Sequence, residues 1–257
     1  MKSTNMPSIK KNSLSVLVPV YNEEKTVAVI LKKLISLKFV HEIIIVDDCS
    51  KDNSASVIKG VKSGKIKFHQ HEKNSGKTAA IKTALKHATG DIIIIQDADL
   101  EYDPDEIEDV INPILKGQAD VVYGSRFLVK KASRVLYYYH YLANKTLTTL
   151  SNILTNLNMT DIETCYKAFR SPIIKNMDLT SSGFGMEVEI TAMISKMPVR
   201  IFEVPISYYG RTYEEGKKIG MKDGIMAIFY IIYYNIIVSK FKSRRDYFKK
   251  VVSELEG

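Results

Sequence analysis

Two aspartates, Asp97 and Asp99, stand one residue apart, shortly after four consecutive isoleucines at residues 92–95, and Glu101 follows them. Such an apolar run is typical of a strand buried on both faces, as in a parallel sheet covered by helices. Ligands of these sheets bind at the carboxyl ends of the strands. Carboxylate oxygens grouped there can hold one divalent cation, and such a cation suits a diphosphate. The acids therefore indicate a nucleotide-linked substrate.

Three further polar clusters follow predicted strands: residues 19–23 (PVYNE), Asp47 with Asp48, and residues 74–77 (NSGK). We expect all of them at the same sheet edge as the acids. Each has a simpler interpretation, since Asp47 and Asp48 also suit a turn and a helix cap. Lys77 at a helix start opposes the helix dipole, which favours a phosphate or carboxylate partner, although a surface lysine is an equally good interpretation.

Apolar runs alternate with helical patterns through the first half of the chain. This alternation predicts an α/β fold with a mostly parallel central sheet flanked by helices. Strands are expected at residues 14–20, 42–48, 65–71, 92–95 and 119–123. One helix is expected to begin after Asn22, which would cap it, and a short helix is expected to end at about residue 61. Two more are expected, one over residues 77–88 and one that begins at residue 103.

The second half of the chain is less regular. A tyrosine-rich helix is expected over about residues 132–156, a helix over 188–197, an extended segment over 199–209 and an apolar helix over 225–238, followed by a basic tail. We predict an N-terminal tail (1–12), one two-part domain (13–219, with halves 13–126 and 127–219), and a C-terminal part (220–257). The C-terminal part contains the apolar helix and an amphipathic tail.

Composition narrows the class of protein. The chain has 257 residues and a formal charge of +8, which favours anionic partners. Nucleic acid is not expected among them, because no recognised binding module accompanies the charge.

Cys49 and Cys165 have no metal-ligand spacing and are too few for a disulfide framework, which favours a reducing compartment. No secretory signal is visible. The apolar stretch 225–238 would span about 21 Å as a helix, short of the roughly 30 Å of a bilayer core.

Six motifs in this order and spacing carry a resemblance: VPVYNEE, DDCSKDNS, NSGKTAA, QDADLEYDP, GSR and RTYEEGKKIG. The chain resembles a family 2 glycosyltransferase of the GT-A fold over about residues 13–219, and is most similar to dolichol- and polyprenol-phosphate sugar transferases. The resemblance implies a metal-dependent hexosyltransferase that inverts the anomeric carbon. Its donor would be a GDP- or UDP-linked sugar, and its acceptor a polyprenyl phosphate.

The resemblance also implies roles for the matching positions. Base and ribose would be contacted at the first two strand ends, by Pro19, Tyr21, Glu23 and Asp48. Asp97, Asp99 and Glu101 would hold Mg²⁺ or Mn²⁺ bridging the diphosphate, with Asp97 near the ribose. Glu101 stands where close relatives often carry glutamine, which adds a negative charge but keeps an oxygen donor.

Basic residues would bind the phosphates. They are Lys77, Arg126 after the strand end, and Arg211 with Lys218 in a late loop that closes over the diphosphate. The sequence Gly-Lys-Lys-Ile at 216–219 departs from the commoner G-x-S-K form, so Lys217 is the alternative to Lys218. Asp99, Arg126 and Asp161 are the predicted catalytic residues.

Asp161 begins a segment similar to the family's D-x-x-[ST]-G-[FY]-K, with Cys165 in place of glycine. An acid near this position serves as a base in relatives with sugar acceptors. A lipid phosphate needs no base, because its second pKa of about 6 leaves the nucleophilic oxygen charged. Asp161 would then position the donor or a cation, and a helix or turn cap is its structural alternative.

The tyrosine-rich helix and the apolar helix indicate a membrane face, because aromatic rings beside lysine and arginine suit a bilayer interface. We therefore expect a peripheral protein at the cytoplasmic face of a membrane. The alternative is that the two helices pack on each other or form an oligomer seam. Two other functions stay open: transfer to a saccharide acceptor, and a non-catalytic nucleotide-sugar sensor at the membrane. An anchoring partner is also possible.

Overall fold

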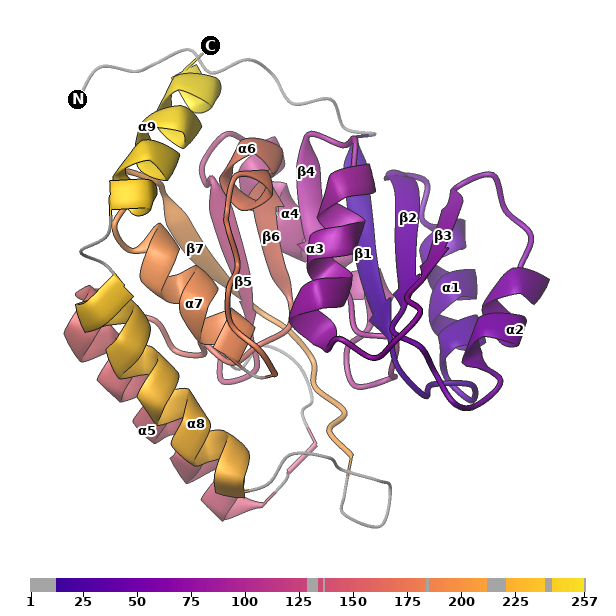
Figure 1. The fold of residues 1–257 in the computed structure, drawn as a ribbon, viewed down its shortest axis with the longest axis horizontal. Helices are drawn as coiled ribbons and strands as arrows, with labels where there is room; N and C mark the ends of the chain where they lie inside the picture. Colours follow the sequence, from indigo (N-terminus) through magenta and orange to yellow (C-terminus); the bar gives the residue numbers. More distant parts are fainter. Residues whose placement is uncertain are drawn as a thin grey trace.

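Among the residues that the structure describes, seven strands form one sheet through the centre of the molecule, in the order β3-β2-β1-β4-β6-β5-β7 (Figure 1). The computed structural model describes residues 13–128, 134–135, 137–183, 185–211, 221–238 and 242–256. All neighbouring strands are parallel except β6, which runs antiparallel between β4 and β5. The predicted α/β fold with a mostly parallel sheet is confirmed. The strands are β1 Leu14–Val20, β2 Val40–Asp47, β3 Ile66–Gln70, β4 Ile92–Ile95, β5 Val121–Ser125, β6 Lys167–Arg170 and β7 Ile201–Pro205.

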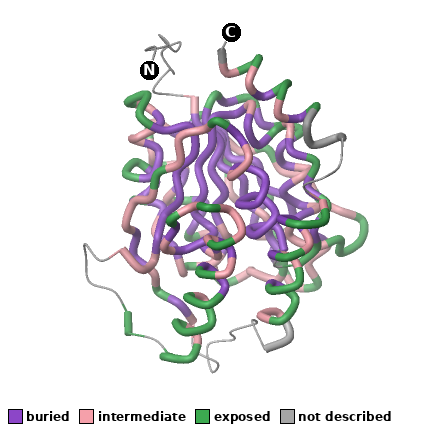
Figure 2. Tube along the Cα trace, turned by 90° about the vertical axis from the view of Figure 1, so that its left-hand side faces the viewer, coloured by how far each residue is buried: buried purple, intermediate pink, exposed green. Residues whose placement is uncertain are grey.

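The hydrophobic core follows the central strands, which form the buried interior of the molecule in Figure 2. All four isoleucines of β4 are at most 1% exposed, as a strand covered on both faces requires. Helix α3 (Lys77–His87) packs on β1 and β2 in front of the sheet in Figure 1, and α4 (Ile107–Leu115) packs behind it on β5 and β6. The carboxyl ends of the parallel strands therefore meet at one edge between two helical layers.

The smaller helices complete these layers. Helix α1 (Val27–Ser36) buries the apolar face of Val27, Ile30, Leu31 and Leu34 completely. The 3-10 turn η1 (Pro104–Glu106) leads into α4, and the carboxylate of Asp103 caps this turn by accepting from the N–H of Asp105. Helices α2 (Ser54–Gly60) and α6 (Ser171–Lys175) are short.

The C-terminal third adds longer helices beside β7. Helix α8 (Met221–Ile232), continued by a π-helical turn (η2, Tyr233–Ile237), lies alongside α5 (Tyr138–Thr155), and α7 (Gly185–Ile194) packs between α8 and the sheet (Figure 1). Helix α9 (Lys242–Glu256) is held to α6 by the hydroxyl of Tyr247, which donates to the carbonyl of Ile173. Within the described ranges, no helix combines the length and the apolar character that crossing a membrane needs.

Three sequence predictions of secondary structure need correction. Asn22 does not cap a helix: it has a φ of +55°, its side chain accepts from the N–H of Lys51, and the helix begins after Thr26. The helix expected from about residue 132 begins at Tyr138, because Tyr137 is extended with a ψ of 128°. The helix expected at 188–197 is α7, at Gly185–Ile194. Strand β6 was not predicted at all.

Candidate active site

The carboxylates of Asp97 and Asp99 lie directly beyond β4, at the carboxyl edge of the parallel strands. Gln96 fixes this turn. Its side-chain amide donates to the carbonyl of Asp97, and its amide oxygen accepts from the hydroxyl of the buried Tyr166. The backbone N–H of Glu101 donates to Asp99 at 3.1 Å. The three predicted metal ligands are therefore brought into one short, tightly held turn.

A divalent cation fits the negative charge that these acids accumulate. Burial, followed by the charges of Asp97 and Glu101, raises the pKa of Asp99 to about 7, although the charge of Arg211 opposes the rise. A bound cation relieves buried carboxylates that repel one another, and hard oxygen donors suit Mg²⁺ or Mn²⁺. Among the described residues, no three His, Cys, Asp or Glu side chains are already grouped to hold a metal. The coordination would therefore be completed on binding.

Arg211 lies across the acids. Its Nη2 is 2.7 Å from Oδ2 of Asp99 and 3.3 Å from Oε1 of Glu23, and its Nε is 3.4 Å from Oε1 of Glu101. Its backbone N–H also donates to Glu101, at 3.0 Å. The structure thus brings together predicted site residues from the first, fourth and last of the six motifs.

Lys77, the first residue of α3, lies between two carboxylates. Its Nζ is 2.8 Å from Asp97 and 3.3 Å from Glu187. Burial alone would lower the pKa of Lys77, but the negative charges of Asp97 and Glu187 hold it well above its usual range. The carboxylate partner expected from the helix dipole is therefore present. Glu187 itself was not predicted, although an acid in the apolar segment that forms α7 is a signal that could have revealed it.

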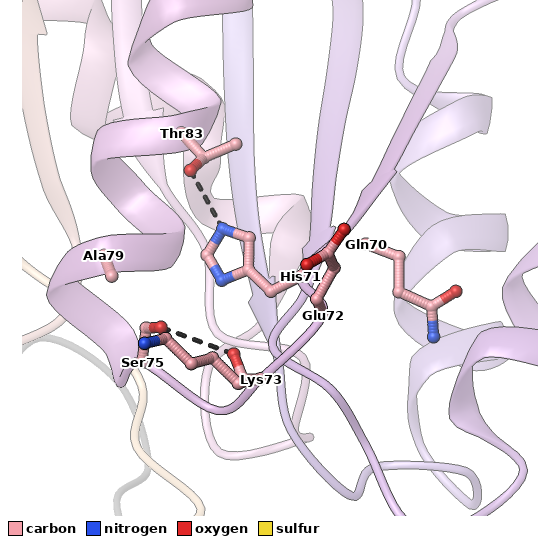
Figure 3. A pocket seen from close by; sticks show the side chains of 7 residues that line it. All are labelled: Gln70, His71, Glu72, Lys73, Ser75, Ala79 and Thr83. Atoms are coloured by element: carbon pink, nitrogen blue, oxygen red, sulfur yellow. Dashed lines mark hydrogen bonds between the residues drawn. The ribbon is translucent and has the colours of Figure 1, made fainter.

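Asp48 holds the loop in front of α3. Its carboxylate is buried and accepts from the backbone N–H of Ser75 at 2.9 Å, from the N–H of Gly76 at 2.7 Å, and from Nδ1 of His71 at 2.7 Å. Gly76 has a φ of +87°, which glycine adopts without strain. The other ring nitrogen of His71, Nε2, pairs with the hydroxyl of Thr83 at 2.9 Å (Figure 3). Asp48 therefore positions Lys77 through this loop.

A hollow of about 750 Å³ opens beside this loop, between the end of β3 and the start of α3 (Figure 3). Both His71 and Ser75 line it, but the acids beyond β4 do not. No role was predicted for His71. Its place directly after β3, at the same edge as Asp48, is a sequence signal that could have revealed it.

The remaining predicted positions of the first motif lie at the same edge. Pro19 is in β1, opposite Val46 of β2, and Tyr21 follows the strand with its side chain 36% exposed. Glu23 accepts from the hydroxyl of Thr26 at 2.8 Å and lies within reach of Arg211. Lys218 and its alternative Lys217 lie outside the described residues, so their places remain predictions.

Arg126 and Asp161 form a two-pronged ion pair beyond β5. Nε of Arg126 donates to Oδ2 of Asp161 at 2.6 Å and Nη2 to Oδ1 at 2.7 Å, while the backbone N–H of Arg126 also donates to this carboxylate. The side chain of Asp161 is fully buried and that of Arg126 is 11% exposed. Burial opposes the charge on Arg126, but Asp161 raises its pKa well above the usual range. The carboxylate of Asp161 is therefore committed to the arginine.

Tyr208 links this pair to the acids. The guanidinium carbon of Arg126 lies 5.1 Å from the centre of the Tyr208 ring, and the hydroxyl of Tyr208 donates to Glu101 at 2.9 Å. Tyr208 was not predicted as a site residue. It lies at the end of the segment expected to be extended, where a tyrosine alone gives no distinctive signal.

The mostly parallel α/β sheet, with carboxylates, lysine and arginine at the carboxyl ends of its strands, agrees with the GT-A fold expected from the motifs. The chain belongs to glycosyl transferase family 2, whose model matches residues 15–177. Over 87% of its length it is 27% identical to a UDP-N-acetylglucosamine–dolichyl-phosphate N-acetylglucosaminyltransferase of Methanococcus voltae, covering 94% of that protein. Over 86% of its length it is 27% identical to an undecaprenyl-phosphate 4-deoxy-4-formamido-L-arabinose transferase of Edwardsiella ictaluri, covering 66% of that protein. The chain thus resembles polyprenol-phosphate sugar transferases.

Solved structures agree on the fold. Glucosyl-3-phosphoglycerate synthase of Mycobacterium tuberculosis, crystallised with Mn²⁺, UDP and phosphoglyceric acid, superposes with a TM-score of 0.66 at 16% identity, over 88% of this chain and 79% of that chain. Mannosyl-3-phosphoglycerate synthase of Rubrobacter xylanophilus superposes with a TM-score of 0.65 at 17% identity, over 86% and 72%. At these identities the likeness shows the shared fold alone.

Proposed function

We propose that this glycosyltransferase moves a sugar from a GDP- or UDP-linked donor to a polyprenyl phosphate, with inversion at the anomeric carbon. The observation that carries the proposal is the convergence of Asp97, Asp99 and Glu101 with Arg211 and Arg126 at one sheet edge. Two relatives whose names specify lipid-phosphate acceptors support the choice of acceptor. Inversion comes from the family resemblance.

The donor would lie along the edge from Asp48 to Arg126. The base and ribose would occupy the region of Pro19, Tyr21 and Asp48, and the diphosphate would lie over the acids. Asp97, Asp99 and Glu101 would hold Mg²⁺ or Mn²⁺. When bound, this cation would stabilise the charge of the departing diphosphate.

The residues of the chain supply the remaining charge stabilisation. Arg211 provides a guanidinium for the diphosphate oxygens, and the ammonium of Lys77 holds the carboxylate of Asp97 in place. Arg126 directs two of its side-chain nitrogens at Asp161, which orients the planar guanidinium toward an anionic acceptor or leaving group. Asp161 acts as a positioning residue. An already ionised lipid phosphate needs no base, which suits a carboxylate committed to arginine.

A donor and acceptor panel tests this function. Purified enzyme is incubated with UDP- and GDP-sugars, with Mn²⁺ or Mg²⁺, and with a short polyprenyl phosphate, a free monosaccharide or an oligosaccharide. We expect transfer to the lipid phosphate and little to the free sugars. Transfer only to a saccharide would support the alternative of polysaccharide or glycoconjugate synthesis. Donor binding without transfer or hydrolysis under any condition would instead favour a sensor.

A membrane-facing surface would bring the enzyme to its acceptor. Helices α5 and α8 pack on each other, as one alternative anticipated, yet both keep apolar side chains exposed. Tyr139 of α5 is 82% exposed, and Ile225 and Phe229 of α8 are 62% and 54% exposed. An aromatic and aliphatic face of this kind suits the interface of a bilayer. We assign it to docking on a lipid surface.

Vesicle sedimentation tests the docking surface. The double variant Ile225→Ser with Phe229→Ser should bind vesicles of phosphatidylglycerol and phosphatidylcholine at least about tenfold more weakly, since burying each such side chain contributes about 1.5–3 kcal/mol. Val29→Ser, which removes an exposed apolar side chain from α1, is the matched control and should bind as the wild type does. Unchanged vesicle binding, or a loss of dimers instead of vesicle binding, would point to a subunit interface.

A further inference from the structure

Among the residues that the structure describes, the guanidinium of Arg211 contacts side chains of site acids only. It contacts Asp99 at 2.7 Å, Glu23 at 3.3 Å and Glu101 at 3.4 Å. The other oxygens of these two carboxylates already accept from the N–H of Glu101 and from the hydroxyl of Tyr208, so a divalent cation would compete for the oxygens that Arg211 contacts. Lys77 differs, because Glu187 gives it a second carboxylate behind the predicted metal ligands. Arg211 and a metal therefore require the same carboxylate oxygens.

The backbone that carries Arg211 is held independently of its guanidinium. The N–H and hydroxyl of Ser207 donate to the buried carboxylate of Glu106 at 2.7 and 2.8 Å. The N–H of Tyr209 donates to the carbonyl of Glu101 at 2.9 Å, and Arg134 donates to the carbonyl of Gly210 at 3.1 Å. The guanidinium can therefore leave the acids by side-chain rotation alone, and its 27% exposure leaves room for that movement.

We infer that Arg211 is an internal counter-cation, which occupies the acids in the ligand-free enzyme and yields them to the metal when a nucleoside diphosphate arrives. This inference rests on the proposed function. A metal binding alone must displace Arg211 and leave it without its carboxylates. A diphosphate supplies new anionic oxygens to Arg211 at the moment it is displaced. Metal and donor therefore bind cooperatively, and by linkage each strengthens the other equally.

Metal binding without turnover tests this coupling. Mn²⁺ binding to the full chain is measured by electron paramagnetic resonance of free Mn²⁺, first alone and then with saturating UDP or GDP. For the wild type we expect weak binding alone and at least about fivefold tighter binding with a diphosphate, within the usual range of coupling between two sites. Arg211→Gln should bind Mn²⁺ alone at least about fivefold more tightly than the wild type and should gain less from the diphosphate.

Two further variants sharpen the test. Lys82→Gln removes one positive charge from a partly exposed lysine that pairs with Asp178 and should behave as the wild type does. Arg211→Lys keeps the charge but cannot reach three carboxylates with one ammonium, so its Mn²⁺ affinity should lie between those of the wild type and Arg211→Gln. Thermal melting confirms that each variant is folded.

The outcomes separate this inference from the proposed function. If the wild type binds Mn²⁺ with a diphosphate but Arg211→Gln binds Mn²⁺ alone no more tightly than the wild type does, the internal counter-cation is refuted and the metal site stands. If neither protein binds Mn²⁺ with UDP or GDP, the acids are not a metal site and both conclusions fail.

Discussion

Replacing Asp99 with asparagine should abolish sugar transfer and, at the same time, stabilise the ligand-free protein at pH 8.5. Asp99 is the central acid of the proposed metal site, so turnover should fall by about 10²-fold or more, as for the loss of other charge-stabilising groups. The gain in stability has a separate origin. Burial and the charges of Asp97 and Glu101 raise the pKa of Asp99 to about 7, which makes its ionisation costly to the folded state.

The sign of the pH dependence follows from this raised pKa. The Asp99 carboxyl ionises near pH 4 in the unfolded chain and near pH 7 in the folded protein, so between these values only the folded state keeps the proton. The free energy of unfolding therefore decreases as the pH rises from about 4 to about 7. The cost at higher pH is a few kcal/mol, at about 1.4 kcal/mol per pKa unit. Asparagine carries no charge and escapes this cost.

Melting temperatures at pH 5 and pH 8.5, together with turnover, measure both effects. Asp99→Asn should melt above the wild type at pH 8.5, and the difference should shrink at pH 5. Asp91→Asn makes the same change at an exposed position before β4, at the opposite end of that strand, and should alter neither quantity. Wild-type turnover in Asp99→Asn would refute its proposed role. A lower melting temperature at pH 8.5 would show that Arg211 compensates the charge of Asp99 more fully than its pKa implies.

The fold of the first half could be predicted because its strands, apart from β3, are largely buried, and because α1 and α4 have clear apolar stripes. Strand β6 could not be, since residues 167–170 (KAFR) begin and end with basic residues. The burial of Lys167 is compensated by its ammonium, which donates to the carbonyls of Ile162 and Thr164. The burial of Arg170 is compensated by its guanidinium, which donates to the carboxylate of Asp120. Such tertiary partners, and the insertion of β6 between β4 and β5, leave no trace in local periodicity.

In the candidate site, too, some residues could be predicted from the sequence and others could not. The acids after β4 were predictable because a strand end in a parallel sheet is a defined place. The partners of other site residues were not predictable: His71 contacts Asp48, Glu187 contacts Lys77 and Tyr208 contacts Glu101. These three residues belong to separate segments that only the folded chain brings to this edge. The sequence also left the role of Asp161 open between a base, a positioning residue and a cap. The contacts with Arg126 favour positioning.

Changes to the pair of Arg126 and Asp161 should separate stability from catalysis. Asp161→Asn leaves the guanidinium of Arg126 buried without its carboxylate, which should cost about 3–5 kcal/mol of stability and much of the activity. Arg126→Lys keeps the positive charge but loses the planar fork that meets both oxygens of Asp161. We expect its turnover to fall by about 10²-fold with a smaller loss of stability.

The double variant Arg126→Gln with Asp161→Asn decides between the two roles. Removing both charges together avoids an unpaired buried ion, so its melting temperature should recover toward that of the wild type. Turnover should not recover, because no guanidinium faces the phosphates. Arg200→Lys is the matched control for Arg126→Lys. Arg200 also donates to Asp120 through two nitrogens, at 3.0 Å each, but this pair lies at the opposite end of β5. If the double variant regained both stability and turnover, Arg126 would hold the fold together and take no part in the reaction.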